Sequence, residues 1–434
     1  MVVPSVSLAQ VGIGGYFQTD NRVFLEDNRF YWNENRLALK MDAQPSRGAH
    51  IYSELWVRGF GFPEVTTSSE LMERQKAKVQ PWDLVIKEAY LDLYDFLLPN
   101  MDIRVGRQRI AWGTGDKLNP TDNLNPDDLE DVWDFGRHLG SNAVKASYYL
   151  GDYTLTAAYI PVFTPAVLPS RDWAQALSAP MELPPGLTLG NLEDRIVTPE
   201  SKLKNSIAAF KIAKNFLGYD FSLSYLYGRD DLPLVTNVKI TSADAQGTVD
   251  MSTKLIYPKT KVVGLDMAGA IGKMGIWAEG AVFFPEKMEM VTDLTDLGMG
   301  IQTTTALDDN PYIKYVVGAD YTFKNGIYVN GQYLHGFIHE RGEDSLEDYF
   351  VFSMEKKFFN DKLKITPVAG GAEIKDFGDI KNNYAVLFAP GITYYPTDNA
   401  EIQFGVRIIE GKNTTAFGRV KDNDEVYLKI KYSF

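Results

Sequence analysis

Charged and polar side chains alternate along two neighbouring stretches of this 434-residue sequence. Glu88, Tyr90 and Asp92 stand two residues apart in the first stretch, and Arg104 and Gln108 share one parity in the second. Residues at even spacing in an extended chain lie on one side, so carboxylates and a guanidinium would meet across two paired strands. Such a stripe either orients a polar solute or serves as a cross-strand ladder that holds a wall together, and both interpretations stay open.

Other residue types give little support for catalysis. Four histidines are present, and they do not cluster in the sequence: His50, His138, His335 and His339. The sequence has no GxSxG, HExxH or P-loop motif. It also has no cysteine, which excludes disulfides, thiolate metal sites and covalent haem attachment. We therefore expect no enzyme and no cofactor.

The stretch from residue 114 to 138 is acidic, with seven carboxylates against Lys117 and Arg137. Asp and Asn near Pro make a weak candidate for a hard-cation site such as Ca²⁺, with Asp122, Asp127 and Asp128 as ligands. The spacing matches no EF-hand loop. A connection of this length could instead fold inward and narrow a channel, as could residues 164–200 with Trp173.

The elements that must position these residues show a period of two. The final segment is the clearest case, because its apolar residues share one face and its polar residues share the other. The apolar face carries Val426, Leu428, Ile430, Tyr432 and Phe434. An unbroken apolar face that ends on Phe is typical of a lipid-facing strand, and a terminal aromatic is the signature that outer-membrane assembly machinery reads.

About eighteen segments repeat this alternation, most of them longer than soluble strands. An even count suits a closed barrel that has both termini on one side. The predicted strands span residues 10–24, 29–44, 48–60, 81–97, 101–113, 139–150, 153–163, 201–216, 218–240, 250–272, 275–290, 311–323, 326–340, 346–358, 363–376, 381–396, 400–412 and 424–434.

The connections between these segments alternate in length. After even-numbered strands the links are short and contain turn residues such as Gly151-Asp152, Leu217-Gly218 and Asn325-Gly326. After odd-numbered strands they are often long, as at 61–80, 114–138, 164–200 and 291–310. Short periplasmic turns opposite long extracellular loops are the asymmetry of an outer-membrane barrel.

Composition agrees with this fold class. No stretch approaches the roughly 20 apolar residues of a membrane-spanning helix, and a net charge of −13 argues against nucleic acid as a partner. The prediction is an all-β, transmembrane, antiparallel up-and-down barrel over residues 10–434. Residues 1–9, which end in Ser7-Leu8-Ala9, are interpreted as a signal-peptide remnant or leader.

Residues 88–116 contain Glu88-Ala89-Tyr90-Leu91-Asp92, a turn, then Gly106-Arg107-Gln108 and Trp112-Gly113. This hairpin resembles the one shared by alginate-export-type barrels and a related, largely uncharacterised family of proteobacterial outer-membrane proteins. Asn119-Pro120 and Asn125-Pro126-Asp127 resemble the second group more closely. The resemblance covers about forty residues and implies an outer-membrane channel for an extended or small polar solute.

Parity along the remaining strands predicts further lumen-facing charges. We expect one basic sector where the first three and last two strands meet, despite Glu34 and Glu54 within it, with Glu279, Asp320 and Glu355 opposite. The basic residues of this sector are Arg36, Lys40, Arg58, Arg407, Lys429 and Lys431. Random lumen charge is an equal alternative. Arg107 and Arg109 would face lipid by strict parity, so a bulge at Gly106 is predicted to turn them inward.

The leading functional prediction is a porin in the cell outer membrane that passes small polar or extended charged solutes through a charged aqueous lumen. One alternative is a barrel sheath around a multihaem cytochrome for transmembrane electron transfer, and another is a surface receptor or adhesin. The expected partners are outer-membrane lipid and lipopolysaccharide, and the barrel-assembly machinery through Phe434. A homo-oligomer and a periplasmic or cytochrome partner stay open.

Overall fold

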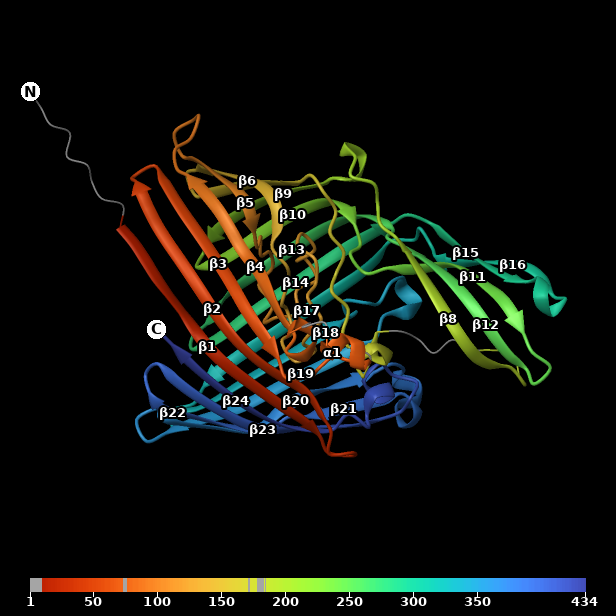
Figure 1. Ribbon diagram of the computed structural model, residues 1–434. Helices are drawn as coiled ribbons and strands as arrows, with labels where there is room; N and C mark the ends of the chain where they lie inside the picture. The colour runs from red at the N-terminus through yellow and green to blue at the C-terminus, as the bar shows by residue number, and fades with distance from the viewer. Residues whose placement is uncertain (1–9, 73–75, 171, 178–182, 184) are drawn as a thin grey trace, which may run out of the picture.

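A computed structural model of the protein describes residues 10–72, 76–170, 172–177, 183 and 185–434. The dominant element is one antiparallel sheet that closes on itself, because β1 pairs with β2 on one side and with β24 on the other. Figure 1 shows the resulting tilted barrel. The leader expected at residues 1–9 lies outside the described residues.

Within the described residues nineteen strands form the barrel sheet. They are β1 (Gln10–Phe24), β2 (Phe30–Ser46), β3 (Ala49–Phe60), β4 (Trp82–Leu93), β5 (Met101–Gln108), β6 (Ser141–Leu150), β7 (Tyr153–Ile160), β9 (Ile207–Phe216), β10 (Tyr219–Arg229), β13 (Lys259–Ile271), β14 (Met274–Pro285), β17 (Tyr312–Thr322), β18 (Ile327–His335), β19 (Asp348–Phe358), β20 (Leu363–Ile374), β21 (Tyr384–Phe388), β22 (Gly391–Thr397), β23 (Ala400–Gly411) and β24 (Glu425–Ser433).

Strands β21 and β22 are two halves of one wall strand, since both pair with β20 and with β23. The break falls at Ala389-Pro390, where proline has no N–H to give to a ladder. The barrel therefore has eighteen wall strands, as the alternation predicts. Every predicted segment contains one wall strand.

Short helices lie in the connections. They are α1 (Ser68–Met72), α2 (Lys76–Val79) and the 3-10 helices η1 (Ala174–Ala176), η2 (Leu203–Asn205), η3 (Thr295–Leu297), η4 (Glu343–Ser345), η5 (Phe377–Asn382) and η6 (Phe417–Val420). No helix among the described residues is long and apolar enough to cross a membrane.

The outer face of the wall is apolar. On β24 the residues predicted to face lipid are exposed, with Leu428 at 41% and Phe434 at 54%, while Lys429 and Lys431 on the other face are half-buried. On β4 the exposed row is Trp82, Leu84 and Ile86, at 47–62%. A continuous exposed apolar surface on this scale is stable only against lipid.

Short and long links alternate around the barrel as predicted. Links 47–48, 151–152, 217–218, 272–273 and 398–399 join strands at one rim. Gly151 and Gly218 have φ of 58° and 82°, the left-handed backbone that tight hairpins require. The long links, including 61–81, 109–140 and 161–206, all leave from the other rim.

The structure contains a second, five-stranded sheet that the sequence did not predict. It consists of β8 (Thr188–Val197), β11 (Leu234–Ala243), β12 (Thr248–Ile256), β15 (Met288–Leu294) and β16 (Gly300–Leu307), and it projects from the long-loop rim (Figure 1). Segments 218–240 and 250–272 are therefore not single wall strands. Their alternation continues past the wall, and the breaks coincide with Pro233 and Pro258.

Some wall strands are also shorter than predicted. Segment 101–113 leaves the wall after Gln108, segment 326–340 after His335, and segment 201–216 joins it only at Ile207. The freed residues have different positions, since 201–204 are exposed whereas 336–340 are largely buried. Residues 109–140 in particular turn into the barrel.

Candidate functional site: the lumen and the segment folded into it

Residues 109–140, here called the inner segment, cross the lumen. They contact β14 and β18 on one part of the ring and β1, β3 and β24 on the opposite part. A chain that touches opposite walls of a closed barrel must lie inside it, and Figure 1 shows the segment coiled there. The inward fold considered from the sequence is thus what the structure shows.

The first attachment of the inner segment is apolar. Ile110, Trp112 and Leu124 pack in one buried cluster with inward-facing wall residues such as Leu226 and Phe283. Removing these side chains from water favours the packed position of the segment by roughly 1.5–3 kcal/mol for each large side chain. The lumen face between β6 and β17 is therefore not uniformly polar, in contrast to the expectation.

The second attachment centres on Glu279 of β14, a carboxylate only 4% exposed. It accepts hydrogen bonds from the backbone N–H groups of Thr114 at 2.6 Å, Gly115 at 3.0 Å and Thr121 at 3.1 Å. At Gly113, φ is +86° and a Cβ would stand 2.4 Å from the Glu279 carboxylate, so only glycine fits. Converging backbone donors replace a cation as the partner of this buried charge.

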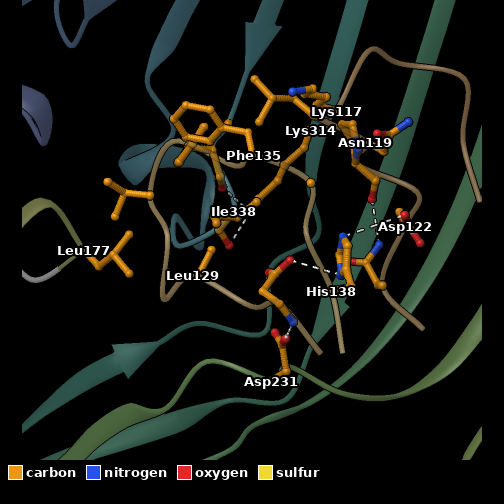
Figure 2. A pocket seen from close by; sticks show the side chains of 18 of the residues that line it. Lys117, Asn119, Asp122, Leu129, Phe135, His138, Leu177, Asp231, Lys314 and Ile338 are labelled. Atoms are coloured by element: carbon orange, nitrogen blue, oxygen red, sulfur yellow. Dashed lines mark hydrogen bonds and ion pairs between the residues drawn. The ribbon is translucent and has the colours of Figure 1, made fainter. Parts of the chain in front are cut away.

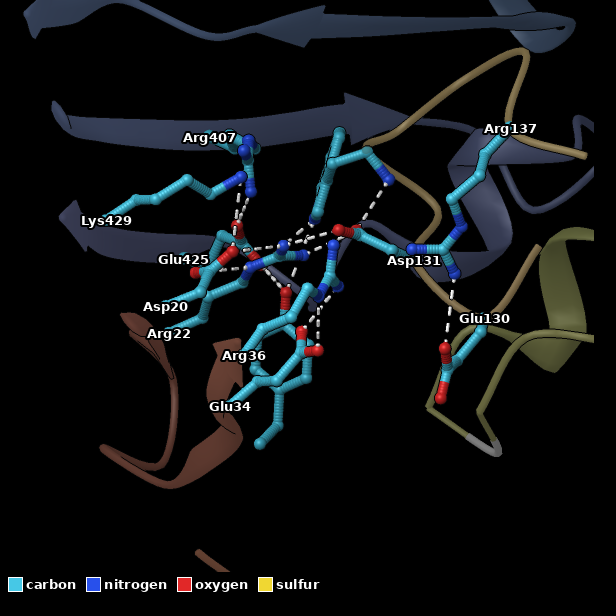
Figure 3. A network of polar contacts seen from close by, with 12 residues as sticks. Asp20, Arg22, Glu34, Arg36, Glu130, Asp131, Arg137, Arg407, Glu425 and Lys429 are labelled. Carbon is cyan, nitrogen blue, oxygen red and sulfur yellow. Dashed lines mark hydrogen bonds and ion pairs between the residues drawn. The ribbon is translucent and has the colours of Figure 1, made fainter. Parts of the chain in front are cut away.

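The third attachment is ionic and lies at the β1–β3 wall. Arg22 donates to both carboxylate oxygens of Asp131 at 2.6 Å and also to Asp20, and all three side chains are buried. Arg58 bonds Glu34 at 2.6 Å and Glu130 of the inner segment at 2.9 Å. Figure 3 shows Arg22 between Asp20 and Asp131, with Glu34 and Glu130 nearby.

Burial alone would raise the pKa of Asp131, but the guanidinium of Arg22 holds it below the ordinary value. Asp131 therefore stays ionised, and the inner segment remains tied to β1 by a charged, bidentate contact. Trp133, two residues on, donates through Nε1 to Glu425 of β24 at 3.2 Å. One short stretch of the segment thus contacts both strands that close the barrel.

The predicted stripe on β4 and β5 has the expected neighbours. Arg104 pairs with Asp92 at 2.6 Å and stacks over the ring of Tyr90 at 3.7 Å. Glu88 accepts the backbone N–H of Arg109 at 2.7 Å, and Gln108, fully buried, donates to the carbonyl of Ala143 at 3.0 Å. The ladder interpretation thus has direct contacts, and lining of a pore by these residues stays a prediction.

The predicted basic sector is spatially continuous but largely neutralised. Strands β23, β24, β1, β2 and β3 are neighbours in the ring. Each charge except one has an acidic partner: Arg36 and Arg58 bond Glu34, Lys40 pairs with Glu54, Arg407 with Glu425 and Lys429 with Asp20. Lys431 lies over the ring of Tyr16 at 4.7 Å. The sector is an ion-pair network and not a surplus of positive charge.

The weak metal candidate was wrong. Asp122 pairs with Arg109, Asp128 with Arg137 at 2.9 Å, and Asp127 lies 3.3 Å from His138. Within the described residues no group of three or more His, Asp or Glu side chains is placed to hold a metal ion. The carboxylates of Asp122 and Asp128 balance arginines of the inner segment.

The bulge predicted at Gly106 was also wrong. Pairing of β5 runs without a register shift through Gly106 and Arg107 to both neighbours. Arg109 turns inward because the strand ends at Gln108, one residue earlier. A shift does occur on the partner side, where Glu54 and Leu55 of β3 face Glu88 and Ile86, so Lys87 of β4 is the extra residue.

Sequence reasoning missed Arg22, Asp131, Trp133 and the anchoring role of Glu279. Parity alone places Arg22 on the same face as Asp20, so its inward position was available from the pattern. Its partner was not, because Asp131 is separated from it by more than a hundred residues and lies in a loop without periodicity.

A closed antiparallel barrel with an apolar outside, a charged inside and loops of unequal length is the architecture of bacterial outer-membrane barrels. No known protein family matches the sequence, and no curated protein is similar to it in sequence. The structure is similar to OccK9 (OpdG) of Pseudomonas aeruginosa, with 11% identity, 99% of each chain covered and a TM-score of 0.52.

Two further neighbours are more distant. OmpT of Vibrio cholerae in its trimer form is 9% identical over 99% of this chain and 100% of that chain, with a TM-score of 0.42. OmpF of Salmonella typhi is 12% identical over 98% and 97%, with a TM-score of 0.41. At such identities the likeness concerns the fold alone.

Proposed function

We propose that this chain is an outer-membrane channel whose passage is narrowed by the inner segment. The observation that carries the proposal is the position of residues 109–140, which are tied to opposite walls by Glu279 and by the Arg22–Asp131 pair. A segment held in this way narrows the open cross-section of the lumen. It does not fill the lumen with a single apolar core.

The proposal includes the outer membrane as the location. The exposed apolar band suits outer-membrane lipid and lipopolysaccharide, and the alternating links suit extracellular loops opposite periplasmic turns. Phe434 continues the ladder through mutual backbone hydrogen bonds with Gly15 at 3.0 Å. We propose it as the residue that assembly machinery reads.

Small polar or extended charged solutes are the proposed cargo. The pore-lining set predicted from the sequence, including Arg36, Arg104 and Lys431, offers charge that is mostly balanced in pairs. Balanced charge favours weak ion selectivity over strict exclusion of one sign. The resemblance of the β4–β5 hairpin to alginate-export-type barrels supports an extended polar solute.

The alternatives gain unequal support. A cytochrome sheath needs a free lumen, and the inner segment occupies its middle, so this reading is disfavoured. A surface receptor is favoured by one observation, the five-stranded sheet that stands clear of the barrel rim (Figure 1).

The test is conductance of the refolded chain in planar bilayers, with the reversal potential measured under a salt gradient. We expect discrete conducting steps and a small reversal potential, because the ion pairs leave little net charge at the constriction. Complete absence of conductance in correctly folded protein would contradict the channel proposal.

A further inference from the structure

A cavity opens between the inner segment and the wall strands β10, β13, β14, β17 and β18. It comprises about 1400 Å³ of empty space including its open mouth, and it differs in character from one end to the other. Figure 2 shows Phe135, Leu177 and Ile338 on one side and Asp122, His138 and Asp231 on the other. Its size suits a molecule larger than an inorganic ion.

The apolar end is aromatic. Phe135 stands edge-on to Phe337 at 6.1 Å between ring centroids, and Trp133 stands edge-on to Trp173 at 5.1 Å. All four line the cavity. Trp173 is 4% exposed, and its indole N–H has no hydrogen-bond partner. This end therefore offers ring faces to an apolar body and one unsatisfied donor.

At the polar end, two carboxylates lack a strong cation. The backbone N–H of Asp127 donates to the Asp231 carboxylate at 2.6 Å, which places the two side chains together. Their acidic neighbours are already neutralised, Asp122 by Arg109 and Asp230 by Arg341 at 2.7 Å. Among the described residues no lysine or arginine lies within salt-bridge distance of Asp127 or Asp231.

Two basic side chains that line the cavity, Lys314 and Arg229, bond backbone carbonyls and not these two acids. The ammonium of Lys314 donates to the carbonyl of Phe337 at 2.6 Å, and the guanidinium of Arg229 donates to the carbonyl of Tyr257 at 2.6 Å. His138 lies 3.3 Å from Asp127, and burial and Arg109 lower the pKa of its imidazole, so it stays neutral. Lys117, an exposed lysine that also lines the cavity, could still meet an anion, but among the described residues it makes no ion pair with Asp127 or Asp231. A cationic ligand would therefore find two acids there that no lysine or arginine neutralises.

We propose that this cavity binds amphipathic cations, with an aromatic or aliphatic body between Phe135 and Trp173 and a protonated amine against Asp127 and Asp231. This inference names a class of solute for the proposed channel. Its biological role rests on the proposed channel function. The binding site itself does not depend on conduction.

Three probes with one ring system separate the alternatives: 2-(1-naphthyl)ethylamine, 2-(1-naphthyl)ethanol and 1-naphthylacetate. Binding to the full chain in detergent is measured by titration calorimetry, and residence time is measured by blockade of single-channel current. We expect the amine to bind about tenfold more tightly than the alcohol, as one charge-assisted contact provides, and the acetate to bind least.

Two variants assign the ends of the cavity. Asp231→Asn should weaken the amine about tenfold and leave the alcohol unchanged, whereas Phe135→Ala should weaken both. Asp42→Asn, an exposed acid on the inward face of β2 near the opposite rim, is the matched control and should change neither. Unchanged migration of the folded form on cold gel electrophoresis would show that each variant folds.

The outcomes separate the two claims. Equal binding of amine and alcohol, tighter binding of the acetate, or an Asp231→Asn variant that binds the amine as the wild type does would overturn the cavity proposal. Selective amine binding in a chain that never conducts would keep the cavity proposal and contradict the channel.

Discussion

Single residues fix the position of the inner segment, and the Arg22–Asp131 pair is the most buried of these contacts. Replacing Asp131 removes one of the two carboxylates that the buried Arg22 guanidinium bonds, leaves only Asp20 as its partner, and so costs more than the pair itself contributes. Replacing Asp131 should therefore destabilise the position of the inner segment more than replacing one member of any exposed ion pair on the same strands.

Asp131→Asn should release the inner segment for cleavage. A buried charged donor that loses its acceptor costs about 1–3 kcal/mol, so transient opening should rise roughly tenfold or more. The measurement is the rate of tryptic cleavage after Lys117 in the folded barrel, followed by mass spectrometry. Asp27→Asn, which removes half of an exposed pair with Arg29, is the control and should leave the rate unchanged.

Asp231 also holds the inner segment, because its carboxyl accepts the backbone N–H of Asp127. The charge of Asp231 depends on pH. Burial, and then the neighbouring Asp230, raise the pKa of its carboxyl to about 6. The group is protonated and uncharged below that value, so its repulsion of the Asp230 and Asp127 carboxyls is smallest in acid and grows as pH rises through about 6. The other titratable or charged groups that interact with it are Tyr257, Arg341 and the Asp230 carboxylate, which Arg341 keeps ionised.

We expect current fluctuations of the reconstituted channel to increase between about pH 5 and pH 7. Asp231→Asn should remove this dependence, because an amide does not titrate. Superimposable pH profiles for the wild type and the variant would show that another group controls the fluctuations.

At the scale of elements, the projecting sheet behaves as an addition to the barrel. It has its own small apolar cluster, including Val238, Ile240 and Met251, and none of its strands pairs with the wall in the described part of the chain. Beneath it the N–H of Asp230 bonds the carbonyl of Pro258 at 3.0 Å, so the wall ends of the β11–β12 hairpin already meet.

Replacing Leu234–Ile256 by a short Gly-Ser linker should therefore leave the barrel folded. We expect unchanged migration of the folded form on cold gel electrophoresis and unchanged conductance, with loss of any binding that depends on the projecting sheet. Failure to fold would mean that the sheet stabilises the wall after all.

Alternation predicted the wall because each wall residue faces either lipid or lumen, and the two environments sort side chains at every second position. The projecting hairpin was missed for the same reason. Segment 218–240 keeps its period beyond Arg229, since β11 also has one covered and one open face. Only Pro233 marks the junction, and proline occurs within wall strands too, as Pro45 in β2 shows.

The inner segment could be foreseen only in outline. Its length indicated a possible inward loop, but its partners on β1, β3 and β14 are set by the closed shape of the sheet and not by any local pattern. For the same reason two of the three acidic residues interpreted as a cation site, Asp122 and Asp128, turned out to be partners of arginines.

At the scale of the whole molecule, the inner segment should determine the conductance, and the wall should determine whether the barrel folds. Gln108 and Ser141 face each other where β5 and β6 leave the sheet, so a short turn can join these strands directly. A variant in which such a turn replaces residues 111–138 should fold and conduct several times more current. Conductance equal to that of the wild type would place the narrowest point elsewhere.

The seam between β1 and β24 joins the first and last strands of the described chain. Until that seam closes, the growing sheet has two open borders whose N–H and C=O groups have no partner in lipid. Gly15 lies so close to Ala38 and to the Phe434 ring that any side chain there would collide with the backbone. A bulky residue at position 15 would thus push β1 away from β2 as well as from Phe434, and leave open edges through which unsealed chains could pair with one another.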